Sequence, residues 1–156
     1  MESRCFTPSM ENVMAQNSVA APVEKPLLGW MRFVLRFAGT FNLLAGASMI
    51  GLYHEGYQML GVPKPSLILP VQVMGILVAL FGVGYHCVAS RPVQNRDLLM
   101  LGFLSKAISS VFALTYVARG VLPWHFAAAV FFADVIYLPP FWIIWRRLRR
   151  LAGNDK

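Results

Sequence analysis

FFADVIYLPPFWIIWRRLRR, residues 131–150, is apolar enough over most of its length to cross a membrane, and it ends in four arginines. An apolar run of about 20 residues spans a bilayer as a helix. Arginines directly after such a run are typical of its cytoplasmic flank. Inside the run stand Asp134 and the pair Pro139 and Pro140. A carboxylate is costly at that depth and proline interrupts a helix, so the stretch predicts a spanning helix with a polar group and a kink.

The composition of the whole chain indicates a membrane protein. Of its 156 residues, 57% are hydrophobic and 13% are charged, whereas a soluble domain holds roughly 45–50% apolar and about 25% charged residues. The net charge of +7 comes mostly from basic residues that flank apolar runs. No basic patch is combined with a stacking surface, so we expect no nucleic-acid partner.

Three further apolar runs precede this one, so the chain has four predicted crossings. They cover about 31–53, 67–88, 98–118 and 124–145. Backbone groups inside a bilayer have no water to bond, so each run is predicted to be a helix. Short connections make consecutive helices antiparallel neighbours. The predicted fold is therefore all-α: an integral membrane four-helix bundle with up-down-up-down topology.

Basic residues predict the orientation of this bundle, because lysine and arginine in short loops mark the cytoplasmic side. The other side has only Lys64 and Arg119. We therefore expect both termini in the cytoplasm and the domain 30–146 in the plasma membrane, the inner membrane of a bacterium. Residues 1–29, which hold no apolar signal segment, are predicted to be a disordered cytoplasmic tail, and residues 147–156 a basic one. The basic residues of the predicted cytoplasmic side are Lys25, Arg32, Arg36, Arg91, Arg96, Arg146, Arg147, Arg149, Arg150 and Lys156.

Three of the predicted helices place a polar residue deep inside the membrane. Asn42, Lys106 and Asp134 lie roughly 12–16 Å from the cytoplasmic ends of their helices at 1.5 Å per residue. Lys106 and Asp134 have opposite charges on adjacent helices, so we expect them to pair, with Asn42 bonded to either one. Tyr137, one turn after Asp134, is expected to join this buried polar cluster. The cluster is either a structural clamp or a functional binding site, and the sequence leaves both open.

Small residues surround these positions and predict close helix packing. The proline pair has a different effect, because its rings crowd the carbonyls of Val135 and Ile136 and free them next to Asp134. The predicted small-residue stripes are Ala38, Gly39, Ala45 and Gly46 on the first helix and Gly75, Ala79 and Gly82 on the second.

The terminal arginines and the histidines are further candidates for functional residues, the arginines for lipid contact and the histidines for ligation of haem or a metal. Arg146, Arg147, Arg149 and Arg150 are expected either to contact lipid head groups or only to fix the topology. His54 and His125 fall near the outer face, where haem or metal ligation would need a third ligand that the sequence does not offer. Cys5 and Cys87 have no metal-ligand spacing. We predict no metal and no cofactor, with quinone and haem left open.

Several motifs together resemble a family of small, uncharacterised four-helix bacterial membrane proteins that lies near the DoxX-like group. The motifs are FAGTFNLLAGASM (37–49), FGVGY (81–85), NRDLLMLGFLSK (95–106) and D-x-x-Y-x-P-P-F (134–141). The matching positions are Gly84, Tyr85, Lys106 and Asp134. DoxX itself implies association with quinone-linked sulfur oxidation or thiol redox systems, but this chain has no cysteine pair inside the membrane.

Two functions follow as hypotheses. The first is a non-enzymatic accessory subunit that binds a small molecule or lipid at its mid-membrane polar site. The second is a small redox, quinone-linked or lipid-linked enzyme subunit that uses Asp134 and Lys106 for proton transfer. The expected partners are the lipid bilayer and either further copies of the chain or another membrane subunit.

Overall fold

The computed structural model describes residues 27–153, and every element in that part of the chain is a helix. Four stretches are long and apolar enough to cross a membrane, which confirms the prediction of a helical membrane protein with four candidate spans. The predicted tail over residues 1–26, together with Cys5, Lys25 and Lys156, lies outside the described residues. The elements are α2 (Gly29–Gly51), α3 (Tyr53–Met59), α4 (Leu69–Ser90), α5 (Arg96–Ala118), α6 (His125–Ala133), the 3₁₀ helix η1 (Val135–Tyr137) and α7 (Leu138–Gly153).

The connection after the first span contains a short helix that the sequence did not predict. After α2 ends at Gly51, the chain continues almost at once as α3. Gly61 follows with φ of 61°, a left-handed conformation that glycine adopts without strain. A segment without regular secondary structure, which includes Pro63 and Pro65, then leads to α4.

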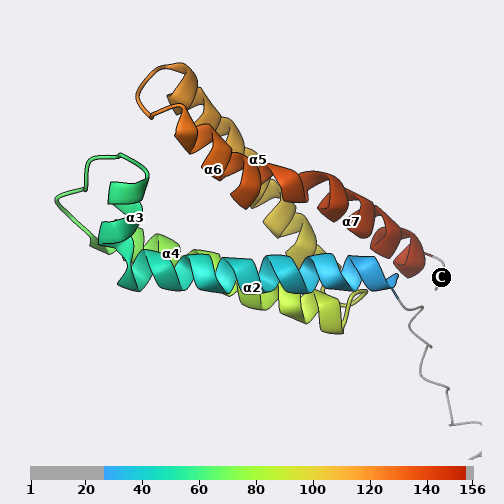
Figure 1. The fold of residues 1–156 in the computed structure, drawn as a ribbon. Coiled ribbons are helices and arrows are strands. Elements are labelled where there is room, and N and C mark those ends of the chain that lie inside the picture. The colour runs from blue at the N-terminus through green and yellow to red at the C-terminus, as the bar shows by residue number, and fades with distance from the viewer. Residues whose placement is uncertain (1–26, 154–156) are drawn as a thin grey trace, which may run out of the picture.

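Helices α2 and α4 lie side by side along most of their length (Figure 1). Their contact is made by the predicted glycine stripes, and it is antiparallel because Gly39 faces Gly82 while Gly46 faces Gly75. A Cβ atom built on Gly82 would lie 2.7 Å from the carbonyl oxygen of Gly39. The two backbones therefore approach as closely as small residues allow, which is how helices associate inside lipid.

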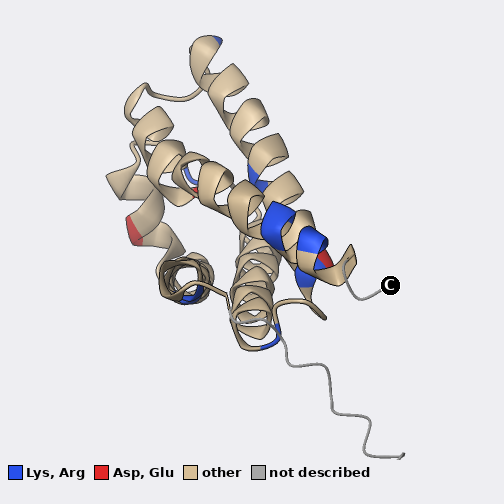
Figure 2. Ribbon diagram, turned by 90° about the vertical axis from the view of Figure 1, so that its right-hand side faces the viewer, with Lys and Arg blue, Asp and Glu red and all other residues tan. Residues whose placement is uncertain are grey.

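The second pair consists of α5 with α6 and α7. Figure 1 shows this pair meeting the α2–α4 pair near the end of α7 and diverging from it toward α3. We call these two ends the arginine end and the α3 end. Figure 2 shows blue ribbon gathered on α7, next to the C-terminus.

The apolar core lies near the arginine end, where the two pairs meet. It includes the first half of α2, the last turns of α4, the start of α5 and most of α7. Lys106 borders this core, because its ammonium lies 5.2 Å from the centre of the ring of the core residue Tyr137. The core residues are Leu27, Met31, Leu35, Ala38, Tyr85, Val88, Ala89, Leu99, Tyr137, Phe141, Ile144 and Leu148.

The fourth span differs from the single kinked helix expected over residues 124–145. It is divided into α6, η1 and α7, and the division begins at Asp134 rather than at the prolines. At its other end α7 continues through the arginines to Gly153. Arginine and leucine are good helix formers, so the helix does not end where the apolar run ends.

Candidate functional site: a lysine–aspartate pair at a helix break

The break in the fourth span leaves one backbone carbonyl without its helical partner. Asp134 leaves the helical conformation, with φ of −129° and ψ of −55°. In a continuous helix the N–H of Tyr137 would donate to the carbonyl of Ala133, four residues earlier. Here that N–H donates to the carbonyl of Asp134 at 3.1 Å. The carbonyl of Ala133 is thereby free to accept a bond from another part of the molecule.

The two prolines favour this arrangement, but they act differently from the predicted kink. Both stand in the first turn of α7, where a helix needs no N–H donor. In a continuous helix the carbonyls of Val135 and Ile136 would accept from the N–H groups of residues 139 and 140, and proline has no N–H. The prolines therefore start a new helix after the break and disfavour its fusion with α6.

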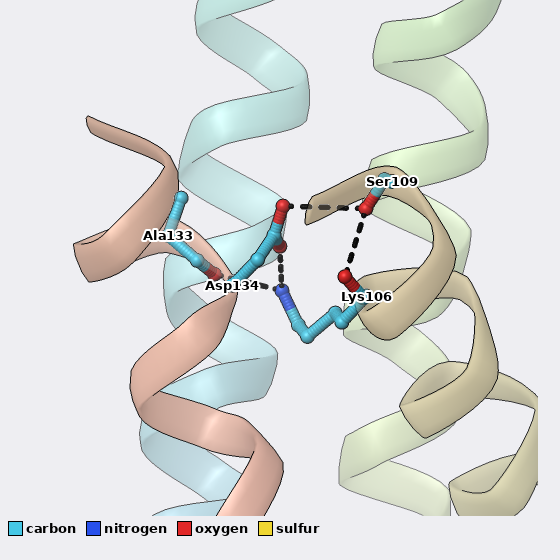
Figure 3. A network of polar contacts seen from close by, with 4 residues as sticks. All are labelled: Lys106, Ser109, Ala133 and Asp134. Atoms are coloured by element: carbon cyan, nitrogen blue, oxygen red, sulfur yellow. Dashed lines mark hydrogen bonds and ion pairs between the residues drawn. The ribbon is translucent and has the colours of Figure 1, made fainter. Parts of the chain in front are cut away.

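Lys106 of α5 fills the position that the break creates (Figure 3). Its Nζ donates to the freed carbonyl of Ala133 at 2.8 Å and to Oδ1 of Asp134 at 2.6 Å. The ammonium also lies 5.2 Å from the centre of the Tyr137 ring, within the range of a cation–π contact. The predicted pairing of the two charges is thus present, and the tyrosine joins it through its ring face.

Three sources of negative potential surround this ammonium. They are the Asp134 carboxylate, the face of the Tyr137 ring and the carboxyl end of α6, where the helix dipole is negative. In a low-dielectric environment each of them is stronger than in water. The break in the fourth span is therefore a cation site, and the chain fills it with its own lysine.

The pair is closed on one side and open on the other. The Lys106 side chain is 8% exposed, whereas that of Asp134 is 25% exposed. Ser109 extends the network, because its Oγ donates to the Lys106 carbonyl at 3.1 Å and lies 3.4 Å from Oδ2 of Asp134. Oδ2 is the less strongly bonded oxygen of the carboxylate.

Asn42 does not take part in this network as expected. It is buried, but it forms no hydrogen bond with Lys106 or Asp134 within the described residues. The reason is its place on α2, between Gly39 and Gly46, on the face that packs against α4. Asn42 was assigned to the predicted cluster because of its depth in the membrane. The rotation of α2 about its axis keeps it apart from Lys106 and Asp134.

Tyr85 packs against the turn of α5 that precedes Lys106, a position that charge and depth in the membrane did not predict. Its ring is buried and packs edge-on against Phe141 at 4.9 Å. It also fills the space over Gly102, where an added Cβ would lie 2.5 Å from the tyrosine hydroxyl. Because Gly102 stands one turn before Lys106, the ring holds α4 against the turn of α5 that presents the lysine. The resemblance of FGVGY was the one sequence signal for this residue.

The two histidines considered as ligands are engaged in hydrogen bonds, one within α3 and one between distant parts of the chain. The Nε2 of His54 lies 3.1 Å from Nε2 of Gln58, and the Nε2 of His125 donates to the carbonyl of Leu60 at 2.7 Å. In the described part of the chain, no three His, Cys, Asp or Glu side chains come together as a metal site would require.

Comparison with protein-family models, with curated proteins and with solved structures found no match for this chain. The DoxX-like resemblance therefore stays a prediction, and the proposals that follow rest on the geometry of the chain.

Proposed function

We propose that the chain is a non-enzymatic accessory subunit of a bacterial inner membrane, which binds a small molecule or lipid at the Lys106–Asp134 pair. In this proposal the four spans form an up-down-up-down bundle with both termini in the cytoplasm.

One observation carries the binding role, namely the unequal exposure of the two charged side chains. A pair that serves only as a clamp is best enclosed completely, because an exposed charge inside lipid costs roughly 2.5–3.5 kcal/mol. A quarter of the Asp134 side chain is nevertheless exposed within a span. A polar group of a bound molecule on that open side would supply the hydrogen bonds that lipid tails lack.

The orientation rests on the distribution of charge. Among the described residues, Arg32 and Arg36 belong to the first half of α2 and four further arginines to α7, and both of these segments contribute to the core at the arginine end. Lys64 and Arg119 belong to connections at the α3 end. An excess of basic residues marks the cytoplasmic side of short loops, so this distribution supports a cytoplasmic arginine end.

The test is to identify what the purified protein retains. Wild type, Asp134→Asn and Asp97→Asn would be purified from membranes in mild detergent, and organic extracts would be compared by mass spectrometry. Asp97 is the matched control, because its side chain is 88% exposed at the start of α5. We expect one compound at near-stoichiometric amount in wild type and Asp97→Asn, and at least about fivefold less in Asp134→Asn, which corresponds to about 1 kcal/mol. Identical extracts from all three proteins would contradict the proposal.

The second function, proton transfer in a redox or lipid-linked enzyme, is favoured by one distance. At 2.6 Å from Nζ to Oδ1, the lysine and aspartate are close enough to exchange a proton directly. The same preparation discriminates the two functions. A haem absorption band, or stoichiometric quinone in the extract, would favour the enzyme and count against the accessory role.

A further inference from the structure

Helix α7 carries arginine and tryptophan side chains beside its fully buried residues, and one of them, Trp145, also packs against the core. Phe141, Ile144 and Leu148 face the core and are fully buried. These arginine and tryptophan side chains border a surface cavity of about 640 Å³ that is largely open. Its walls are Trp142, Trp145, Arg146, Arg149 and Arg150.

A second cavity, of about 320 Å³, adjoins the first. Trp142, Arg146 and Arg150 line both cavities, so these three side chains form the wall between them. The remaining walls of the second cavity are Met31, Ile143 and Arg147. Each cavity thus combines guanidinium groups with apolar surface.

The positive charge of the cavity walls is not neutralised by the described residues. Helix α7 contains no acidic residue, and the ion pairs of residues 27–153 are Arg96–Asp97 and Lys106–Asp134. Arg146 and Arg150 are one turn apart, a spacing at which like charges repel. In addition, the Nε of Arg147 is buried and has no hydrogen-bond partner in this part of the chain. The walls therefore offer donors and positive charge without an acceptor.

The tryptophans hold part of these walls in place. The guanidinium of Arg149 lies 5.4 Å from the centre of the Trp145 ring, and the rings of Trp142 and Trp145 are 5.3 Å apart. Such contacts reduce the side-chain freedom that binding would otherwise remove. Tryptophan also prefers the level of lipid head groups, which places the cavities at the membrane surface.

We infer that these cavities bind the phosphate of an anionic membrane lipid, with Arg146 and Arg150 as its principal ligands. A planar guanidinium donates two parallel hydrogen bonds to a phosphate, and two such groups on one wall hold a phosphodiester from two directions. The apolar walls and the position at the end of an apolar span favour lipid over free phosphate. This site is separate from the Lys106–Asp134 pair and does not depend on the function proposed for it.

The experiment uses the full chain in mild detergent and counts bound lipids by native mass spectrometry. The probes are phosphatidylglycerol, phosphatidylcholine and inorganic phosphate. We compare wild type with Arg146→Gln/Arg150→Gln and with Arg32→Gln/Arg36→Gln. The second double variant removes the same charge from exposed positions of α2 that line neither cavity. A third, Arg146→Lys/Arg150→Lys, keeps the charge that membrane insertion needs and removes the planar donors.

We expect wild type to bind one phosphatidylglycerol at least about tenfold more tightly than phosphatidylcholine, which corresponds to about 1.4 kcal/mol. Arg146→Gln/Arg150→Gln should lose this preference, Arg32→Gln/Arg36→Gln should keep it, and the lysine variant should weaken binding about threefold because only the point charge is left. If both glutamine variants lost the preference for phosphatidylglycerol equally, the proposed site would be wrong, since the net positive charge of the protein would then explain the binding. Equal affinity for the two lipids, or phosphate binding as tight as lipid binding, would also overturn it.

Discussion

The ammonium of Lys106 donates to the carbonyl of Ala133 at 2.8 Å, so the lysine is held by the backbone as well as by the neighbouring carboxylate. This bond exists because the break at Asp134 deprives that carbonyl of its helical donor. The lysine therefore has two acceptors, whereas Oδ1 of Asp134 depends on the lysine alone within the described network.

The first prediction concerns Lys106 and Asp134, which depend unequally on each other for their hydrogen bonds. Asp134→Asn leaves the ammonium its bond to Ala133, so we expect it to lower the free energy of unfolding by about 1 kcal/mol. Lys106→Met leaves both a carboxylate and a carbonyl unpaired and should cost about 2–3 kcal/mol. The double variant should lose less than the sum of the two, by about 1 kcal/mol. Thermal unfolding in detergent measures all three, and strictly additive losses would show that the pair is not energetically coupled.

A second prediction uses two glycines of α4 that are two positions apart. Gly82→Ala brings a methyl group to 2.7 Å from the Gly39 carbonyl and should destabilise the protein by about 1–3 kcal/mol. Gly84→Ala meets no atom within 4 Å and should leave stability unchanged or raise it by up to about 1 kcal/mol. Thermal unfolding of the two variants side by side is the measurement. Similar losses at both positions would argue against close contact between α2 and α4.

The third prediction tests the break in the fourth span. Replacing Pro139 and Pro140 by alanine restores two N–H donors, one of which serves the Ile136 carbonyl. We expect α6 and α7 to join, and the N–H of Tyr137 then to compete with Lys106 for the Ala133 carbonyl. Amide hydrogen exchange over residues 134–140 should become slower in this variant. Pro70→Ala is the control, because Pro70 also begins a helix but follows no break, and it should leave exchange over 134–140 unchanged.

The fourth prediction concerns orientation. In a background with Cys5→Ser and Cys87→Ser, single cysteines would be placed at Val121, which is 64% exposed, and at Gly153, where no atom crowds an added side chain. If the arginine end is cytoplasmic, a membrane-impermeant maleimide should label Val121→Cys in cells whose outer membrane is permeable. Gly153→Cys should react only after the inner membrane is opened. The reverse pattern would invert the proposed topology.

The sequence predicted the spans well because length and hydropathy decide whether a helix crosses a bilayer. It also placed the glycine stripes of α2 and α4 at a helix contact, since side-chain size alone governs how closely backbones approach. The pairing of Lys106 with Asp134 followed from charge and depth. None of these inferences required knowledge of how the helices are rotated.

The parts that the sequence did not predict depend on rotation and on local backbone geometry. Asn42 has the same depth as the pair, but it turns toward α4. The sequence predicted freed carbonyls at Val135 and Ile136, whereas the carbonyl that Lys106 bonds is that of Ala133, because prolines signal a distortion without fixing which carbonyl is released. Tyr85 contributes to the site through the fit of its ring against Gly102. Such a fit between residues distant in sequence depends on the packing of the helices, which one sequence does not reveal.

The uneven core has a consequence for motion. Separating the two helix pairs at the arginine end would expose the apolar core, whereas separating them at the α3 end breaks few such contacts. There the bond from His125 to the Leu60 carbonyl joins the connection after α3 to the start of α6. The apolar contacts between the two helix pairs are thus concentrated at the arginine end. Local opening is therefore expected to begin at the α3 end, where the His125–Leu60 bond joins the two helix pairs, while the core at the arginine end stays folded.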